Sequence, residues 1–165
     1  MRQSTSRAIC TLSASTSLVE HEVVDTSLSV SPEAVAVLRP RELPLISYPY
    51  EWCFSQLRDA ALATLEIQKL ALARGLSLKD ATAYNVQFRG PAPVFIDVLS
   101  VERYVPGSYW AGHRQFCDQF LSPLLLTARL GVPYNAAYRG RIEGLSSTEL
   151  VPLLRLRDKV RPQTF

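Results

Sequence analysis

The sequence predicts an α+β fold in which helices dominate, and three observations lead to this class. From about Phe54 to Arg74 the chain has neither proline nor glycine and is rich in alanine and leucine, which predicts a long helix. The alternating run Val86-Gln87-Phe88 and the apolar run Val94-Phe95-Ile96 flank the turn residues Arg89-Gly90-Pro91, which predicts a small antiparallel hairpin. A chain of 165 residues with 47% hydrophobic residues can bury one sizeable core.

We therefore expect a single domain, over residues 20–156. Residues 1–19 are rich in serine and threonine, contain two arginines and lack acidic residues, which is typical of a disordered or mis-assigned start. Within the domain, residues 20–46 are expected to form short strands and residues 47–126 a helical lobe that contains the hairpin. Residues 157–165 are expected to be a frayed tail.

The first part of the domain contains three β-leaning pieces. Glu22-Val23-Val24-Asp25 and Leu28-Ser29-Val30 are each compatible with a strand, and Ala34 to Leu38 fits either a strand or one turn of helix. Pro40 and Pro44 then favour an extended passage.

The long helix shows the spacing of a buried face. Thr64 and Gln68 lie within an apolar stripe of helical period, so we expect that stripe to face the core. Further apolar residues widen it, which suggests burial on more than one side, and Gly75 follows where a helix would end. The stripe consists of Leu57, Ala61, Leu65 and Leu72, and the widening residues are Leu62, Ile67 and Leu70.

Two more helices are expected after the hairpin. Val98 to Pro106 looks irregular, and a helix is then predicted from Trp110 to about Leu121, with Pro123 bending or restarting it. A last helix is predicted over roughly residues 147–156, because Ser146 and Glu149 have the spacing of a capping box.

Composition excludes several classes of function. The net charge of +3 without a cluster of basic residues argues against a nucleic-acid partner, and no apolar stretch is long enough for a membrane span. Cys10, Cys53 and Cys117 are widely spaced, which argues against a zinc site and a disulfide scaffold and favours reduced thiols in the cytoplasm. We expect Cys53 and Cys117 to be small core residues. No glycine-rich turn typical of a complete dinucleotide or S-adenosylmethionine (SAM) domain is present.

Three polar residues around the hairpin form the candidate site. Asp80 and Asn85 are five positions apart, and Asp97 follows the second strand of the hairpin. The hairpin should bring Asn85 and Asp97 together, with Asp80 reaching the same place from the preceding loop. This is the order of parts in kinase-type phosphoryl transfer, with Asp80 as the catalytic base and Asn85 and Asp97 as magnesium ligands. In the alternative, structural interpretation, Asp80 caps a turn, Asn85 adopts an unusual backbone angle and Asp97 ends a strand.

Long motifs carry a family resemblance over residues 45–126. These are "ISYPYEWCFSQLRDAAL", "LSLKDATAYNVQF", "PVFIDVLSVERY" and "HRQFCDQFLSPLLL". They resemble the front region of bacterial proteins described as class I SAM-dependent methyltransferases, some of them linked to nodulation. That region in turn is similar to the C-terminal lobe of protein-kinase-like folds. The resemblance implies that a methyltransferase domain follows this region in the family, so SAM would reach this protein only through a further domain or a partner chain.

The sequence departs from a complete kinase pattern. Leu78-Lys79 precede Asp80 where a histidine followed by arginine or glycine is usual, and Val98-Leu99 follow Asp97 where Phe-Gly often stands. Three functions remain open. The first is an accessory or remnant kinase-like module without catalysis of its own, which would expose an apolar surface for its partner. The others are a minimal phosphotransferase that uses Mg²⁺ and ATP, and a non-catalytic binding or structural module.

Overall fold

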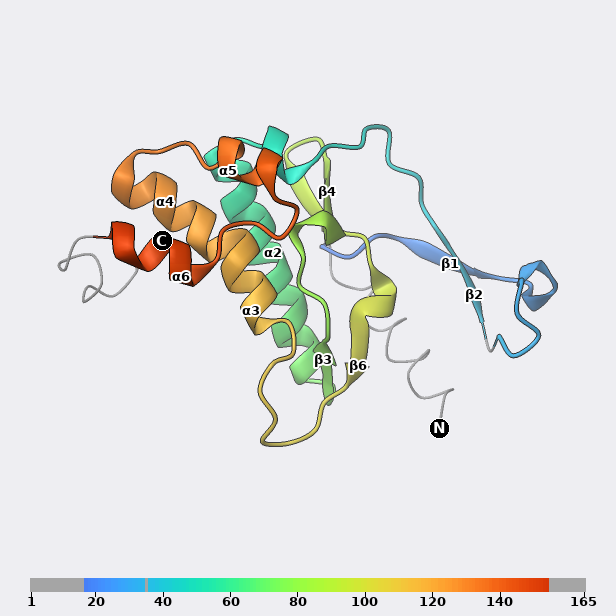
Figure 1. Ribbon diagram of the computed structural model, residues 1–165. Coiled ribbons are helices and arrows are strands. Elements are labelled where there is room, and N and C mark those ends of the chain that lie inside the picture. The colour runs from blue at the N-terminus through green and yellow to red at the C-terminus, as the bar shows by residue number, and fades with distance from the viewer. Residues whose placement is uncertain (1–16, 35, 155–165) are drawn as a thin grey trace.

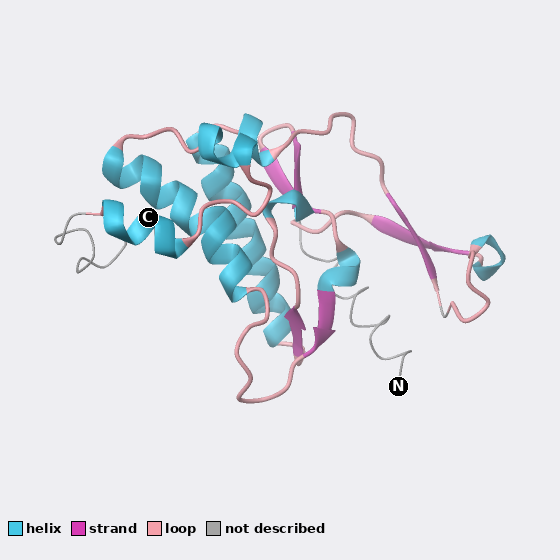
Figure 2. Cartoon of the chain, viewed as in Figure 1, coloured by secondary structure: helices cyan, strands magenta, loops and turns pink. Residues whose placement is uncertain are grey.

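The computed structural model describes residues 17–34 and 36–154, and it consists of a helical lobe from which a two-stranded arm extends (Figure 1). We define the arm as residues 20–34 and 36–41, drawn in blue to cyan in Figure 1. The mixture of helices and small antiparallel sheets confirms the α+β class (Figure 2).

The helical lobe is built around α2, Phe54–Leu72, with a second helical rod beside it. The rod runs through three consecutive segments: α3, His113–Phe116, the π-helical segment η5, Cys117–Leu121, and α4, Ser122–Leu130. Two short helices follow, and single 3₁₀ turns connect the other elements. The short helices are α5, Asn135–Gly140, and α6, Ser147–Leu150; the 3₁₀ turns are η1, Thr26–Leu28, η2, Pro49–Glu51, η3, Ala83–Asn85, η4, Val98–Ser100, and η6, Val151–Leu153.

The described strands form three antiparallel pairs. The arm pairs β1, His21–Val24, with β2, Val37–Pro40. The predicted hairpin is present as β4, Val86–Arg89, and β5, Ala92–Phe95, with Val86 opposite Phe95. A third pair joins β3, Leu76–Leu78, to β6, Val101–Arg103.

The core lies between α2, the rod and the β4–β5 hairpin. Leu57 and Ile67 of α2, Phe95 of β5 and Phe120 of η5 are all fully buried. Trp52, just before α2, packs edge-on against Phe88 with ring centroids 5.1 Å apart, an arrangement that adds to the stabilisation from burial. Helix α2 therefore connects the hairpin to the remaining helices.

The buried face of α2 differs in part from the predicted one. Leu57, Ala61, Thr64 and Gln68 are buried as expected. Leu65 and Leu72 were expected in the core but are exposed, as is Leu62. Alanines at 60, 63 and 71 are buried instead, because small side chains allow neighbouring elements to approach the helix closely. Helical spacing alone did not distinguish these two apolar faces.

The π-helical segment and Pro123 leave two carbonyl groups of the rod without helical donors. The N–H of Ser122 donates to Cys117 O, five residues back, which frees the carbonyl of Asp118. Pro123 has no N–H, so the carbonyl of Gln119 also lacks its usual helical donor. Leu145 N donates to Asp118 O at 2.8 Å and the Tyr138 hydroxyl donates to Gln119 O at 2.7 Å. These two bonds attach the C-terminal part of the chain to the rod.

Other predicted elements are shifted or shorter. Residues 28–30 are not a strand, the second arm strand begins at Val37, and the last helix continues beyond Leu150 only as a 3₁₀ turn. The segment expected to be irregular after Asp97 contains η4 and β6. The end of the expected last helix, residues 155 and 156, lies outside the described residues, as do most of the expected start and the frayed tail.

Candidate functional site

The β4–β5 hairpin places Asn85 and Asp97 side by side. Asn85 precedes β4 and accepts a hydrogen bond on its carbonyl from Ile96 N at 2.8 Å, so the pairing continues one residue beyond the strands. The side chains meet at Ser100, which is buried. Asn85 Nδ2 donates to Ser100 Oγ at 3.2 Å, and Ser100 Oγ donates to Asp97 Oδ2. Two of the three predicted site residues thus contact one hydroxyl group.

Asp80 has a different partner. Its Oδ1 accepts from Thr82 N at 3.0 Å, within the loop between β3 and η3. Its carboxylate does not share a hydrogen-bonding partner with Asn85 or Asp97 in the described part of the chain. Thr82 in turn caps η3, the turn that contains Asn85. Asp80 therefore lies upstream of Asn85 in the same loop, as predicted, with its carboxylate capping a turn.

Glutamine side chains of the rod position this loop. Gln119 Oε1 accepts from Thr82 Oγ1 at 2.6 Å and from Ala83 N at 2.9 Å. Gln115, one turn earlier, accepts from Ala81 N at 2.7 Å. Sequence reasoning missed these residues, because a single sequence gives no signal for a glutamine that binds a loop more than thirty residues away.

The donor set gives only partial support to a magnesium site. Carboxylate and amide oxygens are suitable ligands for Mg²⁺. Both oxygens of Asp97, however, already accept hydrogen bonds, Oδ1 from Leu99 N at 2.9 Å and Oδ2 from Ser100. No cluster of three or more histidine, cysteine or acidic residues with metal-binding geometry occurs among residues 17–34 and 36–154. A metal at Asp97 would have to compete with the cap of η4.

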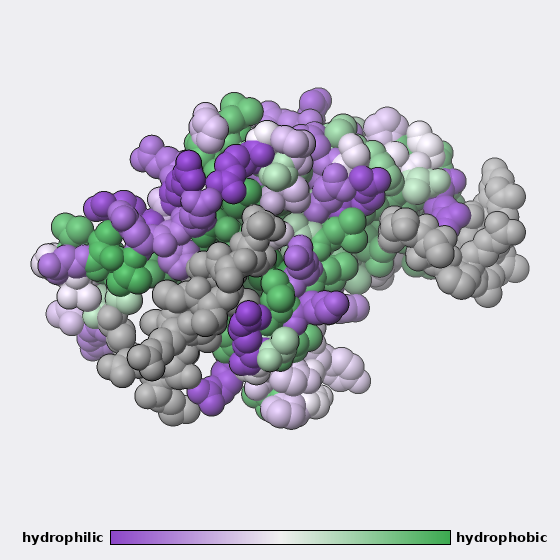
Figure 3. All heavy atoms as spheres, turned by 180° about the vertical axis from the view of Figure 1, so that it is seen from behind, coloured by the Kyte–Doolittle hydropathy of each residue, from purple (hydrophilic) through white to green (hydrophobic). Residues whose placement is uncertain are grey.

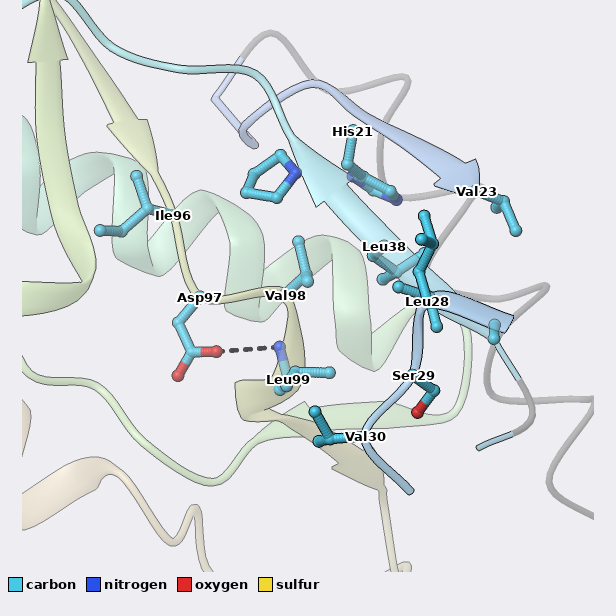
Figure 4. Close-up of a pocket in the computed structure, with 13 residues that line it drawn as sticks. His21, Val23, Leu28, Ser29, Val30, Leu38, Ile96, Asp97, Val98 and Leu99 are labelled. Carbon is cyan, nitrogen blue, oxygen red and sulfur yellow. Dashed lines mark hydrogen bonds between the residues drawn. The ribbon is translucent and has the colours of Figure 1, made fainter. Parts of the chain in front are cut away.

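Asp97 also borders an apolar hollow, which we call the arm groove. It has a volume of about 640 Å³ and lies between the arm and residues 96–99. Figure 4 shows apolar side chains from both walls around it, while Asp97 bonds to the Leu99 amide. Its apolar lining includes Val23, Leu28, Val30 and Leu38 from the arm, and Ile96, Val98 and Leu99 from the lobe.

The two described cysteines are not core residues, which corrects the sequence prediction. Cys53, the N-cap of α2, is exposed, and Cys117 is half-buried. Hydrogen bonds from the Ser55 hydroxyl and from the backbone N–H of Gln56 lower the pKa of the Cys53 thiol. Burial, with the charge of Asp118, raises the pKa of the Cys117 thiol. Both thiols are free; Cys10 lies outside the described residues.

None of the helices in the described ranges combines the length and the apolar character that crossing a membrane requires.

The comparison with curated proteins finds a similarity to a bacterial nodulation protein. The relative is the nodulation protein NoeA of Rhizobium meliloti strain 1021, with 50% identity over 121 residues. The match covers 73% of this chain and 25% of the relative, so this chain spans about a quarter of the relative's length. It supports the expected similarity to nodulation-linked proteins. No family model and no solved structure matches the chain.

Proposed function

We propose that this chain is an accessory module of a larger nodulation-linked protein, without catalysis of its own, and that it binds its partner domain at the arm groove. The observation that carries the proposal is the groove itself, a large hollow with apolar side chains on both walls. Leu99 at its border is 68% exposed and Leu28 is 60% exposed. Contiguous apolar surface of this kind marks interaction sites.

The similarity to NoeA supports a partner. At 50% identity the matched region covers most of this chain but only 25% of the relative. In the larger protein, this region would therefore lie beside a much longer polypeptide. The family resemblance of the sequence suggests that the longer part is a SAM-dependent methyltransferase domain, so we propose that domain as the occupant of the groove.

A binding measurement tests this proposal. The part of NoeA outside the match is expressed separately and titrated into this chain by isothermal titration calorimetry. We expect binding that Leu99→Asp weakens at least about tenfold, which corresponds to about 1.4 kcal/mol. The matched control is Val105→Asp, since Val105 is 64% exposed and lies outside the groove. Absence of binding, or equal losses for both variants, would contradict the proposal.

A second candidate, a minimal phosphotransferase using Mg²⁺ and ATP, is favoured by one observation. Asn85 and Asp97 contact the same Ser100 hydroxyl, so the two proposed magnesium ligands are adjacent. In this mechanism Asp80 would accept the proton of the attacking hydroxyl group.

Titration with Mg-ATP separates the two candidates. The accessory module gives no heat of binding even at millimolar nucleotide. Micromolar affinity that Asp97→Asn abolishes would instead favour the phosphotransferase over the accessory module. Asp25→Asn is the matched control, because Asp25 caps η1 by a bond from Ser27 N at 2.8 Å, as Asp97 caps η4.

A further inference from the structure

The solvent-facing side of α2 carries a regular line of leucines. Leu62, Leu65 and Leu72 are 54%, 41% and 41% exposed. Together with Arg58 and Lys69 they repeat at alternating steps of four and three residues, which is the a/d spacing of a helix that packs against another helix. Single exposed leucines are normal on protein surfaces, whereas a continuous line at this spacing is typical of a helix-packing surface. We call these five residues the α2 seam.

A narrow slot lies along the seam. Leu62 and Leu65 form one wall, and Phe116, Leu121 and Leu124 of the rod form the other. The volume is about 190 Å³. Apolar cavities of about 150 Å³ accept a benzene molecule, so the slot can take one leucine or phenylalanine side chain from outside. Figure 3 shows the molecule from behind, with apolar side chains gathered over the lobe and, separately, over the arm.

The seam carries a positive charge that lacks a partner in the described part of the chain. Lys69 is exposed and forms no ion pair there. Glu66, one turn before Lys69, accepts a hydrogen bond from Ser17, and Asp59, near the start of the helix, pairs with Arg58. A charged residue at an a position of a helix pair selects a partner with the complementary group.

We propose that the α2 seam binds an amphipathic helix of another polypeptide. That helix places apolar side chains against the three leucines, one of them in the slot, and a carboxylate opposite Lys69. Residues 1–16 of this chain contain Arg2 and Arg7 but no aspartate or glutamate, so they cannot supply the carboxylate. Residues 155–165 contain one acidic residue, Asp158, among four basic ones, which does not suit a surface that already carries Arg58 and Lys69. This surface is different from the arm groove, and the inference does not depend on the proposed function.

Two designed peptides test the seam. Both are fluorescein-labelled helices. They differ only at the central a position, which is a glutamate in one and a lysine in the other, and leucine occupies all the remaining a and d positions. Fluorescence anisotropy measures their binding to the full chain. We expect the glutamate peptide to bind at least about tenfold more tightly than the lysine peptide, and Lys69→Glu to reverse this preference. Leu65→Glu should weaken both peptides.

The control is Leu153→Glu, because Leu153 is 58% exposed but belongs to η6, outside the seam. It should leave binding of both peptides unchanged, and circular dichroism verifies that every variant is folded. The proposal is overturned if neither peptide binds, or if Lys69→Glu fails to reverse the preference. It is also overturned if the chain sediments as a dimer that Leu65→Glu dissociates, since a second copy would then occupy the seam.

Discussion

At the scale of single residues, buried glutamines organise the loops around the candidate site. Gln119 fixes the loop that leads to Asn85, and Gln68 binds β3 through Leu78 N at 2.8 Å and Ser77 Oγ at 3.1 Å. Gln87 similarly bonds to both backbone groups of Ser47, each at 3.0 Å. An amide can donate and accept at once, which suits it to satisfy backbone groups that no neighbouring strand or helix reaches.

Replacing Gln119 should therefore destabilise the fold. In Gln119→Ala the Thr82 hydroxyl and the Ala83 amide lose their acceptor, and Ala83 is fully buried. Buried donors left unsatisfied cost about 1–3 kcal/mol, which urea unfolding can measure. Gln115→Ala removes a single bond, to Ala81 N, and should cost less. Equal losses for the two variants would show that the bonds of Gln119 are not the reason for the effect.

The residue scale also shows how far the candidate site was predictable. The proximity of Asn85 and Asp97 followed from the hairpin, because the two ends of a hairpin return to the same place. Ser100, which links them, was not predicted, since its role depends on η4 after the hairpin. The carboxylate of Asp80 was expected to reach the same place; it accepts a hydrogen bond from the Thr82 amide, as the alternative, structural interpretation of a capped turn describes. Whether these residues bind magnesium stays a prediction.

At the scale of elements, the contact between the rod and the loop after α5 depends on a glycine. Gly144 has φ +82°, and a β-carbon there would overlap with the carbonyl oxygen of Asp118, the group that the π-helical segment frees. Leu145 N donates to that same oxygen. Both the backbone angle and the close approach therefore require glycine at this position.

Gly144→Ala should destabilise the protein more than Gly131→Ala. Gly131 ends α4 with φ +68° but has open space around it. Alanine there should lower the free energy of unfolding only by the strain of the left-handed conformation, about 1–2 kcal/mol. At Gly144 the overlap with Asp118 should add about 1–3 kcal/mol. Thermal and urea unfolding of the two variants provide the comparison. A loss at Gly144 no larger than at Gly131 would mean that the loop moves away from the rod at no cost.

The elements differ in how well the sequence predicted them. Helix α2 and the β4–β5 hairpin were located within three residues, because a long segment free of proline and glycine and a turn between apolar runs are strong local signals. Strands β3 and β6 have three residues each, too few to show a period, and they pair across more than twenty residues. The exposed leucines of α2 have the same spacing as core residues, so the sequence could not separate the two faces.

At the scale of the whole molecule, Glu20 connects the arm to the lobe. Its carboxylate pairs with Arg41 of the arm at 2.8 Å and with Arg89 of β4 at 3.0 Å. All three side chains are largely exposed, so salt should weaken these ion pairs. The hydrogen bonds from Arg41 and then Arg89 lower the pKa of Glu20 from its ordinary value of 4.5.

This connection should weaken in acid. Because the folded-state pKa of Glu20 is lowered, its contribution is fully present above pH 4.5 and is lost as the pH falls through the lowered value. The amide NMR signals of Val23 and Leu38 in the arm should therefore shift in a transition centred below pH 4.5. Glu20→Gln should abolish this transition, whereas Glu22→Gln, whose partner Arg39 lies within the arm, should leave it in place. An unchanged transition in Glu20→Gln would assign it to another group.

The π-helical segment also confines the effect of a deletion in the rod to its own turn. Its wide turn contains one residue more than an ordinary α-helical turn would, while α3 and α4 on either side are regular α-helix. Deleting a single amino acid between Cys117 and Leu121 would restore regular winding, and α4 would keep about the same orientation relative to α3, because a wide turn and an ordinary turn both complete one rotation. Leu124 and Leu126 would then still face the interior they now fill, whereas the side chains of the turn itself would shift. Gln119 and Phe120, both buried in this turn, are therefore the side chains that such a deletion would displace.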